Sequence, residues 1–197
     1  MKNICFNPHF EKTRDGRPAC AIFSDRDGTL IRHVDYISEP KDVRLLPGVK
    51  DAVQEILKAK IPFYIITNQS GVGRGYFPIE RVHACQRRLF ELLGINPDQL
   101  AGWCIAPEAP DVENGYRKPS PRFIHEACER LGLSPGKCHM IGDTRVDLET
   151  AWNAGAHAWA VACGKAGFDF PAEDQQEDGY ELKENFAACI RSIRERV

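Results

Sequence analysis

Apolar and polar positions along this chain follow two different rhythms. Short apolar runs bounded by glycine, proline or polar residues predict buried strands at 20–24, 62–67, 102–106, 138–142 and 157–162. Between them, apolar residues recur every three to four positions, which predicts helices near 47–60, 78–93, 119–132 and 147–154. Strands that alternate with helices are typical of an α/β fold with a central parallel sheet.

Both ends of the chain lack this alternation. Residues 1–19 carry little periodicity, and the acidic stretch 168–185 precedes a short final helix. We therefore predict an N-terminal extension at 1–19, a core domain at 20–165, and an acidic linker with a C-terminal helix at 166–197.

The composition fits one globular domain that acts on a small molecule. The 197 residues are 43% hydrophobic and 27% charged, which is enough to bury a sizeable core. A formal net charge of -2 offers no field that would gather nucleic acid or an anionic membrane surface. No run of about 18 apolar residues predicts a membrane span. We expect a monomer or a small homo-oligomer with no nucleic-acid or membrane partner.

Eight cysteines are scattered through the predicted strands, helices and loops, without a Cys-x-x-Cys pair. This distribution is typical of reduced thiols that serve as small core residues. We therefore expect a cytoplasmic protein.

Polar side chains gather where the predicted strands end. In chain order they are Asp25, Asp27, Thr67, Asn68, Arg117, Lys118, Asp143 and Asp147. Ligands of open α/β sheets bind outside the carboxyl ends of the strands, so we expect these side chains to converge on one site.

The residue types at this edge favour a metal ion and a phosphate. Carboxylates gathered at one point repel each other and are driven toward protonation unless a cation lies among them. Asp25 and Asp143, with a backbone carbonyl and waters, offer the hard oxygen ligands that suit Mg²⁺. Thr67, Lys118 and the N–H groups of the turn after Asp25 would meet an anion with several oxygens, such as phosphate.

Asp25 and Asp27 are suited to two different tasks. Side chains at positions i and i+2 of a strand share a face, so both can flank one phosphoryl group. A carboxylate beside Mg²⁺ can attack phosphorus and form an aspartyl-phosphate, which is the role we predict for Asp25. A second carboxylate can protonate the leaving oxygen and later deprotonate water, which is the role we predict for Asp27.

Four ordered motifs resemble those of the haloacid dehalogenase-like phosphatase superfamily: "DRDGTL", the Thr of "TNQSG", the Lys of "RKP" and "GDTRVD". The resemblance covers about residues 20–165 and implies a three-layer, Rossmann-like core. It implies that Thr67 and Lys118 act with the two aspartates as catalytic residues that hold the phosphate.

The same resemblance implies a Mg²⁺ site formed by Asp25, Asp27 and Asp143. Asp147 is then expected to orient Lys118 or a Mg²⁺-bound water.

A closer resemblance is to the branch that contains heptose bisphosphate and histidinol-phosphate phosphatases, carried by "DRDGTLI", "TNQSGVGRGYF" and "RKPSP". Members of that branch have no large cap domain, and the spacings here leave no room for one. The resemblance implies that the loops 31–46, 69–77 and 106–117 set specificity, and that Asn68, Arg74 and Arg117 bind the substrate or its phosphate. His33 and Asp35 are read as part of a solvated loop.

One feature of the branch is missing from this chain. Its members commonly carry a zinc loop, Cys-x-His followed by Cys-x-Cys, just before Arg-Lys-Pro. Here "CIAPEAPDVENGYRKP" leaves Cys104 as the one candidate ligand, with Ala106, Asn114 and Tyr116 at the other positions. One thiolate cannot make a four-ligand site, so we predict no structural zinc and a loop held by its prolines and by packing.

These observations predict a Mg²⁺-dependent phosphatase that hydrolyses a phosphomonoester of a small metabolite, such as a sugar phosphate or a heptose bisphosphate-like compound. Histidinol phosphate, a nucleotide or a polynucleotide end are alternative substrates. A non-catalytic phosphate-binding scaffold is an alternative of another class, but Asp25, Asp27, Lys118 and Asp143 are all present. A mutase or phosphotransferase would need a lid that excludes water, and the sequence shows none.

Overall fold

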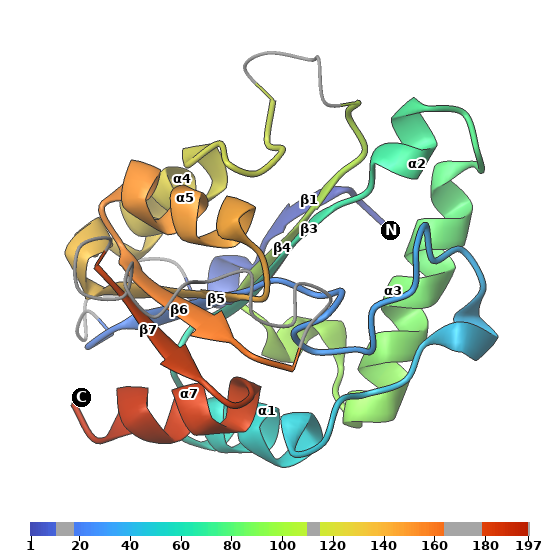
Figure 1. Ribbon diagram of the computed structural model, residues 1–197. Helices are drawn as coiled ribbons and strands as arrows, with labels where there is room; N and C mark the ends of the chain where they lie inside the picture. Colours follow the sequence, from blue (N-terminus) through green and yellow to red (C-terminus); the bar gives the residue numbers. More distant parts are fainter. Residues whose placement is uncertain (11–17, 110–114, 164–178, 197) are drawn as a thin grey trace.

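A computed structural model describes residues 1–10, 18–109, 115–163 and 179–196, and within them seven strands form one sheet (Figure 1). The strands are β1 (Ile4–Phe6), β2 (Ala21–Ser24), β3 (Phe63–Asn68), β4 (Gly102–Ala106), β5 (Cys138–Gly142), β6 (His157–Val161) and β7 (Tyr180–Lys183). Their order across the sheet is β1-β4-β3-β2-β5-β6-β7. All neighbouring pairs are parallel except β1 with β4.

Helices cover both faces of the sheet and give the molecule three layers. The helices are α1 (Val49–Lys58), α2 (Ser70–Gly73), α3 (Ile79–Leu93), α4 (Arg122–Leu131), α5 (Arg145–Ala154) and α7 (Phe186–Arg194). Short 3-10 turns are η1 (Pro8–Phe10), η2 (Pro40–Asp42), η3 (Pro97–Gln99) and η4 (Pro135–Lys137). In Figure 1, α4 and α5 lie above the sheet, and α1 and α7 lie below it. One apolar cluster joins the sheet to α1, α3 and α7, and a second joins it to α4 and α5.

The central strands are buried because helices cover both faces of the sheet. Every residue of β2, β4 and β5 is buried, and so are the first five residues of β3. Such unbroken apolar runs are what a parallel sheet between two helical layers requires. The predicted α/β fold with a central parallel sheet is confirmed, with β1 as the antiparallel exception, and the described residues form no large cap.

All five predicted strands and the helices were placed correctly to within a few residues, but β1 and β7 were not predicted. Both are short edge strands that are only partly buried, so their apolar pattern is weak. β1 is held by Trp103, whose indole N–H donates to the carbonyl of Lys2 at 2.9 Å. Both ends of the chain therefore contribute to the sheet, while the predicted domain boundaries at 20 and 165 stay a prediction.

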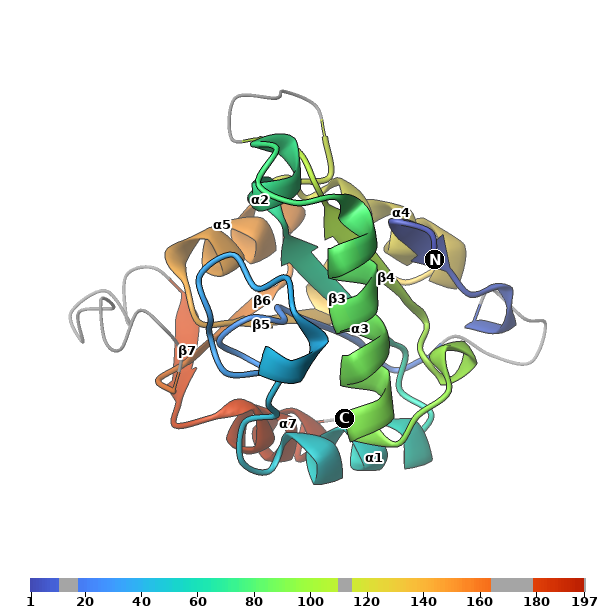
Figure 2. The ribbon, with the colours of Figure 1, turned by 90° about the vertical axis from the view of Figure 1, so that its right-hand side faces the viewer.

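The parallel order brings the carboxyl ends of β2, β3, β4 and β5 together at one edge. Figure 2 shows the segment after β2, which carries η2, lying beside α3. The ion pair between Arg81 of α3 and Glu39, at 2.6 Å, supports this packing.

None of the helices in the described part of the chain has the length and apolarity needed to cross a membrane.

Candidate active site

A buried ion pair network lies at the end of β2. Asp25 follows the last residue of β2, and its N–H donates to the carbonyl of Ile141 on the adjacent β5 at 2.8 Å. The Nζ of Lys118 lies 2.5 Å from Oδ1 of Asp25 and 2.6 Å from Oδ1 of Asp147. All three side chains are at least nine-tenths buried, so this lysine joins two carboxylates inside the protein.

Asp147 is fixed by the start of α5. Its Oδ2 accepts hydrogen bonds from the N–H of Thr144 at 3.1 Å and from the hydroxyl of Thr144 at 2.7 Å, which completes a capping box. Both of its oxygens are thereby engaged, one by Thr144 and one by Lys118. The predicted role of orienting Lys118 fits these contacts.

Asp143 approaches the loop after Asp25 closely because Gly28 has no side chain. Gly28 has φ +99°, a conformation that favours glycine, and a Cβ built there would lie 2.1 Å from Oδ2 of Asp143. Any larger residue at position 28 would displace this carboxylate.

Three buried aspartates lie close together at this point. Carboxylate oxygens of Asp25, Asp143 and Asp147 lie within 4.8 Å of one another, and all three residues are buried. Burial raises the pKa of Asp25 well above its usual range, Lys118 opposes this, and the neighbouring aspartates raise the pKa further. Burial lowers the pKa of Lys118, but Asp147 and Asp25 outweigh it and raise the pKa above its usual value. Three buried carboxylates that lie this close offer hard oxygen donors, which suit Mg²⁺.

Asp27 lies in a separate polar cluster. Its Oδ2 accepts from the hydroxyl of Thr67 at 3.0 Å and from Nε2 of Gln69 at 2.9 Å. The guanidinium of Arg26, which is fully buried, donates to both carboxylate oxygens of Asp27 at 3.0 and 3.1 Å. Nη1 of Arg26 lies 3.4 Å from Oε1 of Gln86 on α3.

Arg26 and Gln69 were missed by the sequence reasoning. Both stand inside quoted motifs, "DRDGTL" and "TNQSG", next to residues that were predicted. The available signal was the position of each residue, but a lone Arg or Gln at a strand end gives no indication of which carboxylate it will contact.

Asn68 contacts the main chain of Lys118. Its Nδ2 donates to the Lys118 carbonyl at 3.0 Å, and its Oδ1 accepts from the Lys118 N–H at 2.9 Å. This two-point contact fixes the backbone that carries Lys118. Substrate binding by Asn68 stays a prediction.

The two predicted substrate arginines come from different loops at the rim. Arg74 follows α2, and Arg117 precedes Lys118. Burial lowers the pKa of Arg117, and the positive charge of Arg74 lowers it further, so the two guanidinium groups share one neighbourhood. Two cations that repel each other there would be stabilised by an anion.

The segment before Lys118 is held by α4. The hydroxyl of Tyr116 donates to Oε1 of Glu126 at 3.0 Å, and the guanidinium carbon of Arg122 lies 4.4 Å from the centre of the Tyr116 ring. Nε of Arg122 also donates to Glu126 at 2.9 Å. We call these three side chains the tyrosine clamp. It holds one of the positions where the branch commonly has a zinc ligand.

The other residues of this loop give less information. Pro110 and Asn114 lie outside the described residues, and Pro107 contributes its carbonyl, which accepts from the N–H of Gly73 at 2.9 Å. The thiol of Cys104 is 4.0 Å from the carbonyl of Tyr116, and burial raises its pKa far above the usual thiol value. The absence of structural zinc stays a prediction.

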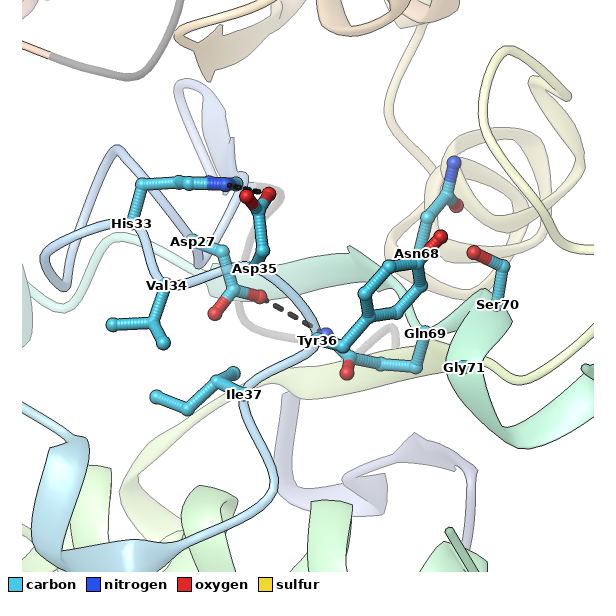
Figure 3. Close-up of a pocket in the computed structure, with 10 residues that line it drawn as sticks. All are labelled: Asp27, His33, Val34, Asp35, Tyr36, Ile37, Asn68, Gln69, Ser70 and Gly71. Atoms are coloured by element: carbon cyan, nitrogen blue, oxygen red, sulfur yellow. Dashed lines mark hydrogen bonds and ion pairs between the residues drawn. The ribbon is translucent and has the colours of Figure 1, made fainter. Parts of the chain in front are cut away.

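A cavity of about 240 Å³ opens beside Asp27. Its walls come from the end of β3 with the turn after it, and from the loop after β2: Asp27, His33, Val34, Asp35, Tyr36, Ile37, Asn68, Gln69, Ser70 and Gly71. In Figure 3, Asp27 lies between the His33–Asp35 pair and the ring of Tyr36. His33 and Asp35, which were predicted to belong to a solvated loop, line this cavity, and Nε2 of His33 lies 3.1 Å from Oδ1 of Asp35.

Comparison with known proteins agrees with this geometry. Residues 26–155 match the family model for haloacid dehalogenase-like hydrolases. A D-glycero-beta-D-manno-heptose-1,7-bisphosphate 7-phosphatase of Mesorhizobium japonicum is 36% identical over 174 residues, which are 81% of this chain and 79% of that protein. A D-glycero-D-manno-heptose-1,7-bisphosphate 7-phosphatase of Thermosynechococcus vestitus is 34% identical over 158 residues, or 75% of this chain and 81% of that protein.

A solved structure shares the fold over nearly its whole length. It is the D,D-heptose 1,7-bisphosphate phosphatase of B. bronchiseptica complexed with magnesium and phosphate, with a TM-score of 0.78 and 26% identity. The match covers 90% of this chain and 99% of that one.

Proposed function

This chain belongs to the haloacid dehalogenase-like hydrolase family and is a phosphatase, and from that premise we propose that it uses Mg²⁺ and Asp25 to hydrolyse a phosphate ester of a sugar bisphosphate. The observation that carries the proposal is the buried contact of Asp25 with Lys118 beside Asp143. This contact supports the proposal because it joins a carboxylate suited to attack phosphorus with a cation suited to hold phosphoryl oxygens. The nearby carboxylate of Asp143 adds a donor for a divalent ion.

The metal would be held by Asp25, Asp27 and Asp143. These residues offer oxygen donors, as Mg²⁺ requires, and the close approach of the buried carboxylates of Asp25 and Asp143 supports a cation site here. When bound, Mg²⁺ supplies charge stabilisation for the phosphoryl oxygens. Asp147 has both oxygens engaged by Lys118 and Thr144, so it supports the site rather than filling it.

The residues of the chain can then carry hydrolysis in two steps. A carboxylate oxygen of Asp25 attacks phosphorus, the bond to the leaving oxygen breaks, and that oxygen takes a proton from Asp27. Asp27, now a carboxylate, removes a proton from a water molecule, which attacks the aspartyl-phosphate and releases inorganic phosphate. Lys118 and Thr67 hold the phosphoryl oxygens during both steps.

Asp27 must change partners in this cycle. Arg26 donates two hydrogen bonds to its oxygens, and Thr67 and Gln69 add two more. This arrangement fits the half of the cycle in which Asp27 acts as a base. Proton donation to the leaving oxygen requires at least part of this cluster to release it.

A bisphosphate substrate is supported by the two rim arginines. The first phosphate would occupy the site at Asp25, and Arg74 with Arg117 offers a cationic position for a second phosphate. Asn68 is proposed to contact the substrate between them. The named relatives act on heptose 1,7-bisphosphate, so a heptose bisphosphate is the first substrate to test. Histidinol phosphate and nucleotides lack the second phosphate on a compact sugar.

The test is phosphate release from heptose 1,7-bisphosphate, other sugar bisphosphates, sugar monophosphates, histidinol phosphate and nucleotides, with Mg²⁺ or with EDTA. We expect Mg²⁺-dependent release with a preference for bisphosphates, and no release by the Asp25→Asn variant. A preference for histidinol phosphate or a nucleotide would contradict the substrate assignment. A folded wild-type protein that binds phosphate but releases none would instead support a scaffold.

A further inference from the structure

The mouth of the cavity beside Asp27 carries an unusual pair of side chains. Tyr36 is 49% exposed and Tyr76 is 59% exposed; among the described residues, the only other exposed large apolar side chain is Met1. The two tyrosine rings contact each other, with centres 4.9 Å apart and planes at 79°. Exposed apolar groups that cluster, rather than scatter, commonly mark a binding surface.

The pair joins the two loops that flank the cavity. Tyr36 belongs to the loop after β2, and Tyr76 follows the short helix α2 after β3. A Cβ built at Gly71 would lie 3.0 Å from Cδ1 of Tyr36 and 2.6 Å from the ring of Phe77. The absence of a side chain at Gly71 therefore lets the Tyr36 ring settle against α2.

Tyr36 is held in a backbone conformation that tyrosine rarely adopts. Its φ is +52°, in the left-handed region. Such outliers persist where the surroundings fix them, and they cluster at ligand sites. Here the surroundings are Gly71 and Tyr76, and the ring forms part of the cavity wall that also contains Asp27.

The leaving group must occupy this cavity if Asp27 gives it a proton. The cavity of about 240 Å³ is smaller than the roughly 300 to 1,000 Å³ of typical drug-sized pockets, so it suits one sugar-sized group. One wall is polar, with His33 and Asp35, and Tyr36 on the opposite side combines an apolar ring with a hydroxyl (Figure 3). A sugar has the matching chemistry, because it carries hydroxyl groups and apolar C–H faces.

We propose that Tyr36, supported by Tyr76, is a specificity residue that packs against the sugar of the leaving group. Tyr36 makes the contact, and Tyr76 is a positioning residue that keeps the Tyr36 ring at the mouth. The inference rests on the proposed phosphatase function and adds the residues that select a sugar over a small leaving group.

The test measures kcat and KM for two substrates in the wild type and in the variants Tyr36→Asn, Tyr76→Ala and Tyr76→Phe. Asparagine tolerates the left-handed backbone, so Tyr36→Asn removes the ring without adding strain. One substrate is the best sugar bisphosphate of the wild type, and the other is acetyl phosphate, which carries a phosphate but no sugar. Lys58→Ala, an exposed change on α1, is the control variant.

We expect Tyr36→Asn to raise KM for the sugar bisphosphate about tenfold, with kcat within about twofold and acetyl phosphate hydrolysis unchanged, because a lost apolar contact weakens binding and leaves the chemistry intact. Tyr76→Ala should raise KM about threefold to fivefold, and Tyr76→Phe should restore it, since the phenylalanine ring keeps the packing. Lys58→Ala should match the wild type.

Equal losses on both substrates would overturn the assignment, because they would indicate a general structural role. Unchanged KM for the sugar bisphosphate in both ring-deleting variants would overturn it as well. Inactive wild-type protein on both substrates would overturn the phosphatase function itself, and this inference with it.

Discussion

The two sides of the candidate site differ in burial and in the elements that carry their residues. The phosphoryl side consists of Asp25, Lys118, Asp143 and Asp147, none more than 5% exposed. Asp25 and Asp143 follow strand ends, Asp147 lies in the first turn of α5, and Lys118 lies in the turn before α4. The leaving-group side consists of loops, in which Tyr36 and Tyr76 are about half exposed. The first side is fixed by the core of the fold, while the second is fixed by contacts between loops. Substitutions should therefore have their largest effect on activity at Asp25, and progressively smaller effects toward the rim.

The largest effect is expected for Asp25→Asn. The amide cannot attack phosphorus, so kcat should fall by at least about 10⁴-fold. The fold should persist because Lys118 keeps Asp147 as a partner and a buried carboxylate is removed. Steady-state kinetics and thermal unfolding with and without Mg²⁺ measure both points. Near-normal turnover would end the nucleophile assignment.

Lys118→Met tests whether the ion pair network also supports the fold. The change leaves Asp25 and Asp147 buried without their cation, and breaking such a pair costs about 3 to 5 kcal/mol of unfolding free energy. Urea unfolding measures the loss. A double variant, Lys118→Met with Asp147→Asn, should recover part of it because one uncompensated charge is gone.

A Lys118→Met protein as stable as the wild type would contradict the buried network. Lys58→Met, which removes an exposed cation from α1, is the matched control and should change stability by less than about 0.5 kcal/mol.

Asp27→Asn lies at the boundary between the two sides and should depend on the leaving group. Without the acid, kcat should fall by about 10²-fold or more for a sugar phosphate but much less for a substrate with a good leaving group, such as p-nitrophenyl phosphate. A plot of log kcat against leaving-group pKa should be steeper in the variant. An equal loss for all substrates would show that Asp27 serves the site in another way.

The phosphoryl side could be predicted from the sequence because its residues follow strands. Asp25, Thr67 and Asp143 occupy positions that the strand ends themselves dictate, and the parallel order of β2, β3 and β5 brings them together. Lys118 follows no strand and was placed by the resemblance of its motif. The structure shows what holds it there, namely the two hydrogen bonds between its main chain and the side chain of Asn68.

The leaving-group side could not be predicted in the same way. A loop has no periodicity, so nothing in the sequence indicates that Tyr36 and Tyr76 meet, or that Gly71 gives them room. The strands β1 and β7 were missed for a related reason, because edge strands of three and four residues are half-buried and too short to show a pattern. Sequence patterns report burial, and these regions have little of it.

The smallest effect is expected at the tyrosine clamp, which holds the segment before Arg117 and Lys118 from outside the site. Tyr116→Phe removes the hydroxyl that contacts both carboxylate oxygens of Glu126 and should lower stability by about 1 kcal/mol. Because Arg117 is adjacent, KM for a bisphosphate should rise a few-fold, on the order of the same 1 kcal/mol, while acetyl phosphate is hydrolysed as before. Glu126→Gln keeps an acceptor and should lie between the two proteins. If metal analysis found one zinc per chain, and chelation rather than Tyr116→Phe loosened the loop, the clamp would lose its role. Stability and KM changes that appear together in Tyr116→Phe would support the clamp as the contact that positions the segment before Arg117.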